Sequence, residues 1–369
     1  MSMLFTPVAI GALTLPNRIV RSATAERMAD DEGRPQPRMA DVYRELVRGE
    51  VGLIVTGHMY VHPGGKAHPE MTGVYSDELI PGLARLAEAV HQEGGLVTAQ
   101  INHGGMQCYL AAVPDAIAPS DVLTSTRNRP AREMSVGEIE LVIDAYAQAA
   151  RRVKEAGLDG VQLHAAHGYL ISQFLSPFIN KRTDKWGGDL EGRMHFLRAV
   201  CQAVRAQVGP LYPVWTKLGM QDAVEGGLTL EEGTRVVEAL QGMGLDGVEI
   251  SIGVAGVRSG SMRTGIRTEA DEAYFRSMAQ QARRVTRRPI ALVGGFRTQS
   301  VMEGVLASGD ADCISLCRPL ICEPDLPRRM RLGLQQHSSC ISTNLCWTDK
   351  LGEGTACRCP IEKESGTRG

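Results

Sequence analysis

Short apolar runs alternate with amphipathic segments along most of the chain. The runs are rich in Val and Ile and are continuous, a pattern typical of parallel strands covered by helices. The segments between them are long enough to be crossover helices. The sequence therefore predicts a β/α unit repeated eight times, with strands at residues 19–25, 52–61, 96–102, 160–166, 214–219, 247–252, 289–294 and 313–316.

Helix start signals support this reading. Ser135 is followed three residues later by Glu138, which forms a capping box before a helix over 139–156 that ends at Gly157. Thr229 is placed to cap a later helix in the same way. Helices are therefore expected between the strands.

The expected fold is a single-domain α/β protein, a (β/α)8 TIM barrel. Eight such units need roughly 250 residues, and the region from Ile19 to about Gly333 supplies them. A doubly wound sheet is the alternative, weakened because no Gly-x-Gly-x-x-Gly follows the first strand. A short hairpin over Phe5–Leu15 would plug the bottom of the barrel. The expected division is a barrel over 1–337 and an irregular, cysteine-containing tail over 338–369.

Composition narrows the class of protein. Hydrophobic residues make up 43% and charged residues 22%, as in ordinary globular proteins. The net charge of -2 gives no excess of positive charge of the kind that binds nucleic acid. No apolar run reaches the roughly 18 residues of a membrane helix, and the first 16 residues lack the layout of a secretory signal. Nine scattered cysteines favour a reducing compartment, so we expect a cytoplasmic protein with a small-molecule partner and no nucleic acid or membrane partner.

Catalytic groups of a barrel enzyme lie at the carboxyl ends of the strands. The fourth strand ends in His164, His167 and Tyr169, three polar groups within six residues. They could donate hydrogen bonds to one oxygen and a proton to a nearby carbon. Packed or metal-binding histidines are the alternative, but no strand end offers an obvious carboxylate as a further ligand, so no metal site is expected.

The last two strands point to an anion site. Gly294 and Gly295 follow the seventh strand and Arg318 follows the eighth, where barrels bind phosphate. A Gly-Gly pair alone is more often a tight turn. Gln100, at the third strand, could hydrogen-bond the edge of a heterocycle, and Lys217, at the fifth strand, could stabilise an anionic ring. Either residue could instead be a polar core residue with its hydrogen bonds satisfied inside the protein. Together they suggest a phosphorylated heterocyclic cofactor.

Three stretches carry a family resemblance: Leu15–Val20, Gln100–Gly105 and above all Asp159–Arg193, which contains His-Ala-Ala-His-Gly-Tyr-Leu and Asn-Lys-Arg-Thr-Asp. Over essentially the whole barrel the chain resembles the old yellow enzyme family of FMN-dependent NADH:flavin oxidoreductases. The resemblance implies FMN as cofactor and NADH or NADPH as hydride donor. Asp184 and Arg193 also match, and for both we expect structural ion pairs.

The resemblance implies a role for each candidate. His164 and His167 would hydrogen-bond the carbonyl or nitro oxygen of the substrate, and Tyr169 would donate the proton. Gln100 would read the pyrimidine edge of FMN, and Lys217 would lie beside its N1 and C2 carbonyl. The full set implied around FMN is Ala23, Thr24, Gly57, Gln100, Lys217, Gly294, Gly295, Cys317 and Arg318.

The chain departs from the family pattern in two places. Bacterial ene-reductases carry a Pro-Met-Cys type sequence after the first strand, where this chain has Ala23-Thr24-Ala25. Thr24 is therefore expected to supply the hydrogen bond of the missing cysteine. Larger relatives bind an iron–sulfur cluster through a Cys-x-x-Cys-Asn type motif after the barrel. Here Thr343 stands at the second cysteine position of that motif, so we expect no cluster, although four tail cysteines remain: Cys340, Cys346, Cys357 and Cys359.

The predicted activity is that of an ene-reductase, an FMN-dependent NAD(P)H oxidoreductase acting on activated C=C bonds of α,β-unsaturated carbonyl or nitro compounds. The alternatives are a flavin-dependent amine or alcohol dehydrogenase, a dienoyl-reductase-like enzyme, and a non-catalytic, regulatory flavin-binding barrel. The sequence allows a homo-oligomer without fixing the oligomeric state.

Overall fold

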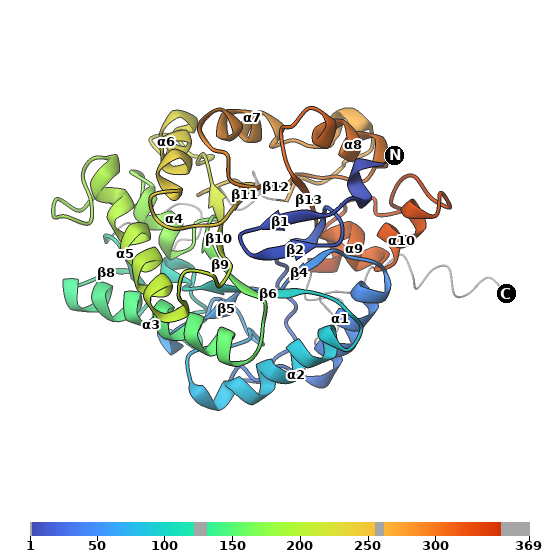
Figure 1. Ribbon diagram of the computed structural model, residues 1–369. Coiled ribbons are helices and arrows are strands. Elements are labelled where there is room, and N and C mark those ends of the chain that lie inside the picture. The colour runs from blue at the N-terminus through green and yellow to red at the C-terminus, as the bar shows by residue number, and fades with distance from the viewer. Residues whose placement is uncertain (1, 122–130, 255–261, 348–369) are drawn as a thin grey trace.

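The computed structural model describes residues 2–121, 131–254 and 262–347 (Figure 1). Eight parallel strands form a closed barrel, because β4 pairs with both β3 and β6 and β13 pairs back onto β3. Each of the eight predicted runs contains a barrel strand. In barrel order they are β3 (Ile19–Arg21), β4 (Leu53–Val55), β6 (Val97–Asn102), β9 (Gly160–Ala165), β10 (Val214–Gly219), β11 (Val248–Ser251), β12 (Ile290–Val293) and β13 (Cys313–Leu316).

Helices surround the barrel (Figure 1). The predicted capping box at Ser135 is formed at the start of α3, and Thr229, the predicted cap of α6, also forms a capping box, with Glu232. Within the described ranges, no helix is both long and apolar enough to cross a membrane. The helices are α1 (Pro37–Arg48), α2 (Ile80–His91), α3 (Val136–Glu155), α4 (Leu170–Leu175), α5 (Leu190–Val208), α6 (Leu230–Leu240), α7 (Arg276–Val285), α8 (Gln299–Ala307), α9 (Arg318–Cys322) and α10 (Leu326–Arg331).

The second predicted strand is interrupted, in contrast to the single run expected over 52–61. It consists of β4 and a short β5 (Met59–Tyr60), which pairs with the end of β6. The break lies at Gly57, whose backbone N–H donates to the buried Glu26 carboxylate at 2.9 Å. This N–H is therefore not available to a neighbouring strand, and a Cβ at Gly57 would lie 2.1 Å from Glu26 Oε2.

The N-terminal hairpin is formed by β1 (Val8–Ile10) and β2 (Leu13–Leu15), in antiparallel register. It crosses the centre of the barrel in the view of Figure 1. Ile10 and Leu15 pack into one apolar cluster with inward-facing barrel residues, among them Val20 and Trp215. The hairpin closes the amino-terminal end of the barrel, as predicted, so the opposite end is the one open to ligands.

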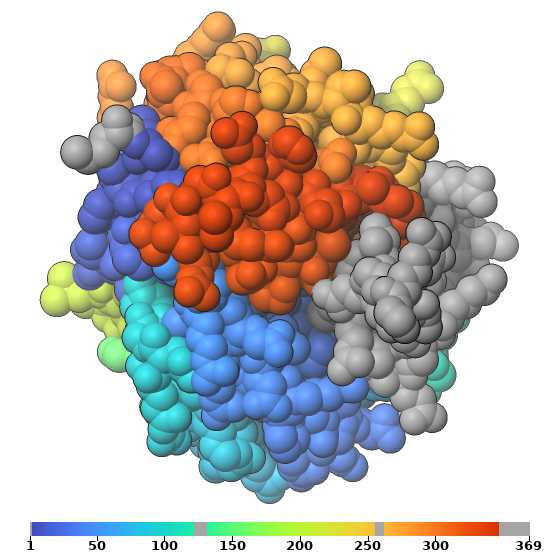
Figure 2. Space-filling view, turned by 90° about the vertical axis from the view of Figure 1, so that its right-hand side faces the viewer, coloured from blue at the N-terminus to red at the C-terminus, as the bar shows by residue number. Residues whose placement is uncertain are grey.

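Two further short strands, β7 (Ile117–Ala118) and β8 (Arg132–Glu133), pair in the connection between β6 and α3. At the other end of the chain, α9, α10 and residues 338–346 pack on the side of the barrel. Figure 2 shows this red segment between the orange part of the chain and the blue part that contains α1. Arg328 N donates to Gly49 O at 3.0 Å, and Arg331 pairs with Glu50, which fixes this contact.

Candidate active site

A tight left-handed turn after β9 places the histidines and the tyrosine. His167 (φ 59°) and Gly168 (φ 72°) are both left-handed, a conformation that is uncommon for residues other than glycine. The surrounding backbone holds it: His167 N donates to Ile252 O at 3.0 Å, and Gln107 Nε2 donates to His167 O at 2.6 Å. The turn reverses the chain so that Tyr169, the residue before α4, faces back toward β9.

The structure brings the three candidate catalytic side chains together. The His164 ring centroid lies 5.1 Å from that of His167 and 4.8 Å from that of Tyr169. His164 is buried, whereas His167 and Tyr169 are partly exposed. One small molecule at the barrel mouth could therefore reach all three.

Burial favours the neutral form of both histidines. Burial, reinforced by the nearby Lys217 charge, lowers the pKa of His167 to about 3. Burial also places the pKa of His164 well below its ordinary value. The Ala166 backbone N–H donates to His164 Nδ1 at 3.3 Å, so the proton of this neutral ring is on Nε2. His164 thus carries one N–H donor of fixed position, and His167 Nε2 lies 2.7 Å from Ser251 Oγ.

A third imidazole, His58, belongs to the same cluster and was missed in the sequence. Its ring centroid lies 4.9 Å from that of Tyr169 and 5.8 Å from that of His164. Asn102 Nδ2 lies 2.9 Å from His58 Nδ1, and His68 Nε2 lies 3.2 Å from His58 Nε2. The signal was present, because His58 interrupts an apolar run at the mouth end of the second strand. The predicted continuous strand over 52–61 instead places His58 inside that strand.

Strand register assembles a polar layer inside the barrel. Parallel pairing sets Gln100 opposite Gln162 and Lys217 opposite Glu249. Gln100 Nε2 donates to Gln162 Oε1 at 2.6 Å, and Gln162 Nε2 donates to Glu249 Oε2 at 2.9 Å. Lys217 Nζ lies 3.2 Å from Glu249 Oε1 and donates to Ser22 Oγ at 2.7 Å. The two predicted residues, Gln100 and Lys217, therefore belong to one buried network.

The glycine pair after β12 forms a cradle that side chains would obstruct. Gly295 has φ 75°, and a Cβ there would lie 2.7 Å from the Tyr274 ring. At Gly294, with φ 154°, a Cβ would lie 3.2 Å from the backbone nitrogens of Tyr274 and Phe275. Only glycine suits both positions.

Arg318 begins α9 and is buried. Its Nη1 donates to Arg263 O and to Asn344 Oδ1, each at 2.7 Å. Both acceptors are uncharged, and no ion pair of Arg318 with a carboxylate is found among the described residues. Within the described part of the chain, neutral acceptors thus orient the guanidinium, which suits an anion site.

The remaining predicted cofactor residues lie at the ends of the first, second and eighth strands. Thr24 Oγ1 lies 3.1 Å from Cys317 Sγ and donates to Ser22 O at 3.0 Å, which joins the ends of β3 and β13. Ala23 is partly exposed, and Gly57 is buried with its N–H bound to Glu26. The roles of these residues toward FMN stay predictions.

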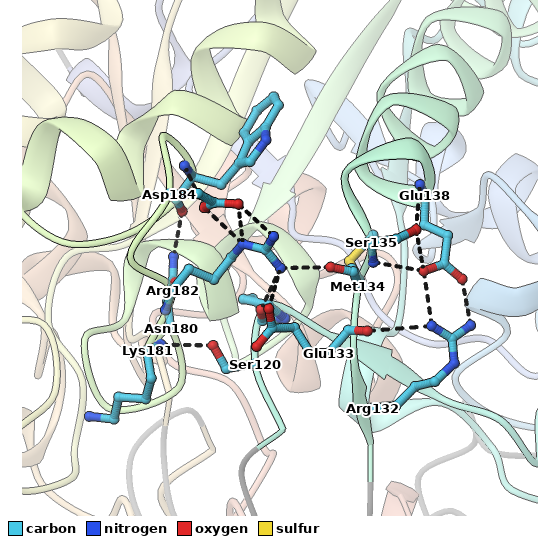
Figure 3. Close-up of polar contacts among 12 residues, drawn as sticks. Ser120, Arg132, Glu133, Met134, Ser135, Glu138, Asn180, Lys181, Arg182 and Asp184 are labelled. Atoms are coloured by element: carbon cyan, nitrogen blue, oxygen red, sulfur yellow. Dashed lines mark hydrogen bonds and ion pairs between the residues drawn. The ribbon is translucent and has the colours of Figure 1, made fainter.

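Asp184 and Arg193 form ion pairs, as expected. Asp184 pairs with Arg182, whose guanidinium also donates to the Met134 carbonyl (Figure 3). The same guanidinium donates to the Pro119 carbonyl. Arg193 is buried and pairs with Glu232, the third residue of α6. Both pairs hold connections in place around the barrel.

The tail cysteines are only partly within the described residues. Cys340 is buried and packs with Cys322, and Cys346 is partly exposed. Within the described ranges, no three His, Cys, Asp or Glu side chains are grouped so as to hold a metal ion. Cys357 and Cys359 lie outside these ranges, so the expectation that the tail binds no iron–sulfur cluster stays a prediction.

Comparison with known sequences decides the family. Residues 3–337 match the NADH:flavin oxidoreductase / NADH oxidase family. The chain belongs to this family. This family agrees with the resemblance seen in the sequence.

Two curated relatives show the extent of the similarity. The NADH oxidase of Thermoanaerobacter brockii is 34% identical over 99% of this chain and 56% of its own length. The NADPH dehydrogenase of Bacillus subtilis is 33% identical over 88% of this chain and 93% of its own length. The chain thus spans about half of the first relative and nearly all of the second.

Similar solved structures agree with the fold. A 2-naphthoyl-CoA reductase complex superimposes with a TM-score of 0.87 at 30% identity, over 94% of this chain and 54% of that one. An old yellow enzyme homologue from Zymomonas mobilis gives a TM-score of 0.80 at 28% identity, over 96% of this chain and 98% of that one. The predicted TIM barrel is confirmed.

Proposed function

We propose that this flavin oxidoreductase reduces the activated C=C bond of α,β-unsaturated carbonyl or nitro compounds. The observation that carries the proposal is the group of His164, His167 and Tyr169 at one turn, two neutral imidazoles beside a phenol. Reductases among the related structures, such as morphinone reductase, support it by analogy.

The protein residues act on the two ends of the conjugated system. The Nε2–H of His164 and a donor from His167 would bind the substrate oxygen. They would draw electron density away from the β-carbon, which prepares it to accept hydride. Tyr169 would donate its hydroxyl proton to the α-carbon. Because the imidazoles are neutral, they bind an uncharged carbonyl oxygen without placing a second buried cation near Lys217.

The described residues fit FMN. The glycine cradle at Gly294 and Gly295 and the Arg318 guanidinium, which is held by neutral acceptors, suit its phosphate. Gln100 provides amide donors and acceptors for the edge of the ring system, and Lys217 provides a positive charge inside the barrel. Bound FMN would supply the hydride-transfer chemistry between nicotinamide and substrate.

The purified protein is expected to carry FMN, and Arg318→Ala should weaken its binding by roughly 10- to 100-fold. The variant removes a charge-assisted hydrogen bond to the phosphate, which is typically worth about 1.5–3 kcal/mol. Fluorescence titration of the flavin-free protein measures the dissociation constant. The exposed Arg284 on α7 serves as a matched control, since Arg284→Ala should leave it unchanged. Wild-type protein that takes up no FMN would contradict the assignment.

A further inference from the structure

Residues 338–344 are fixed to the barrel next to the proposed phosphate site. Ser338 N donates to Arg297 O at 2.9 Å, and the Glu323 carboxylate accepts from Ser338 Oγ and Ser339 N, both at 2.7 Å. Further along, Gly265 N donates to Ser342 O at 3.3 Å. The segment after the barrel therefore has a defined path across the loop that follows β11.

At the end of this path, Asn344 joins two elements of the barrel. Its Oδ1 accepts from Arg318 Nη1 at 2.7 Å, and its Nδ2 donates to Met262 O at 3.0 Å. Its backbone is left-handed, with φ 62°, a conformation that asparagine tolerates better than most residues. Asparagine thus suits both the turn and the two hydrogen bonds.

The contact between Arg318 and Asn344 differs from an ordinary ion pair because the acceptor is uncharged. Arg318 is buried, and its Nη1 is held by an amide oxygen of Asn344 and by the Arg263 carbonyl. Neutral acceptors fix the plane of a guanidinium while leaving its charge available. A carboxylate at position 344 would instead compete with an incoming anion.

We propose that Asn344 is a positioning residue for the flavin phosphate, acting through Arg318. This inference rests on the proposed function, because it takes the phosphate monoester of FMN as the anion that Arg318 binds. The segment after the barrel then contributes to the cofactor site through an amide side chain, independently of its cysteines.

The test compares FMN with riboflavin, which lacks the phosphate, on the flavin-free protein. Asn344→Ala should weaken FMN binding by roughly 3- to 10-fold, the range of one hydrogen bond, and leave riboflavin binding unchanged. Because Asn344 acts through Arg318, the double variant with Arg318→Ala should bind FMN no more weakly than Arg318→Ala alone. Thr343→Ala, at an exposed neighbour, is the matched control and should bind both flavins like the wild type.

Asn344→Asp is a second test variant in case Asn344→Ala does not fold. It keeps the size of the side chain and an acceptor for Arg318. It should also lose FMN affinity while riboflavin binding holds. If Asn344→Ala weakens the binding of FMN and of riboflavin equally, the inference is wrong. It is also wrong if the losses of FMN affinity add up in the double variant. Neither outcome contradicts the proposed function. If Arg318→Ala leaves the preference for FMN over riboflavin intact, the phosphate assignment fails and the inference with it.

Discussion

Replacing Tyr169 with Phe is expected to slow reduction of cyclohexenone by about 10²- to 10⁴-fold, the usual contribution of a positioned general acid. The phenylalanine keeps the ring that packs at 4.8 Å from His164 and 4.9 Å from His58, so the site should keep its shape. Flavin binding and reduction by nicotinamide should therefore survive. Stopped-flow measurement of the two half-reactions separates these effects.

Two comparisons sharpen this prediction. Tyr212→Phe removes a hydroxyl that donates to Leu158 O at the opposite end of β9, and both half-reactions should be unchanged. His164→Ala should weaken ligand binding as well as slow turnover, because it removes a donor to the substrate oxygen. If Tyr169→Phe is reoxidised by cyclohexenone as fast as the wild type, the proton comes from elsewhere and the assignment is wrong.

Lys217→Met is expected to destabilise the fold by about 3–5 kcal/mol, the cost of leaving one member of a buried ion pair without its partner. The Lys217 and Glu249 side chains are 4% and 0% exposed. Glu249 would keep hydrogen bonds from Ser22 and Gln162 but lose its counter-charge. Denaturant unfolding of the flavin-free protein at neutral pH measures the change.

A second substitution separates charge from packing in this prediction. Adding Glu249→Gln to Lys217→Met removes the uncompensated carboxylate with almost no change in size, so most of the lost stability should return. If the double variant is as unstable as Lys217→Met alone, the loss comes from packing, and the account of the buried pair is wrong.

The barrel could be predicted because the chain repeats one physical pattern. Continuous apolar runs mark each buried strand, and Ser135 and Thr229 mark helix starts through local capping. The site at the fourth strand followed from the same logic, since strand ends meet at one mouth. The break in the second strand at Gly57 could not be predicted from the sequence. It depends on a hydrogen bond from the Gly57 N–H to Glu26, which lies 31 residues earlier in the chain.

Partners across the barrel were harder to predict than the residues themselves. Lys217 was identified, but Glu249 was not, although an acidic residue between Val248 and Ile250 in an apolar strand signals a buried pair. The contact between Arg318 and Asn344 joins residues 26 positions apart through an irregular segment. No periodic pattern marks such a contact, so only the structure reveals it.

The central claim is tested most directly by anaerobic stopped-flow mixing of the FMN-loaded protein, first with NADH or NADPH and then with a panel of enones and nitroalkenes. We expect at least one nicotinamide to bleach the flavin absorbance, and at least one activated alkene to restore it with formation of the saturated product. Fast bleaching followed by reoxidation only with dioxygen, and no saturated product from any member of the panel, would contradict the account.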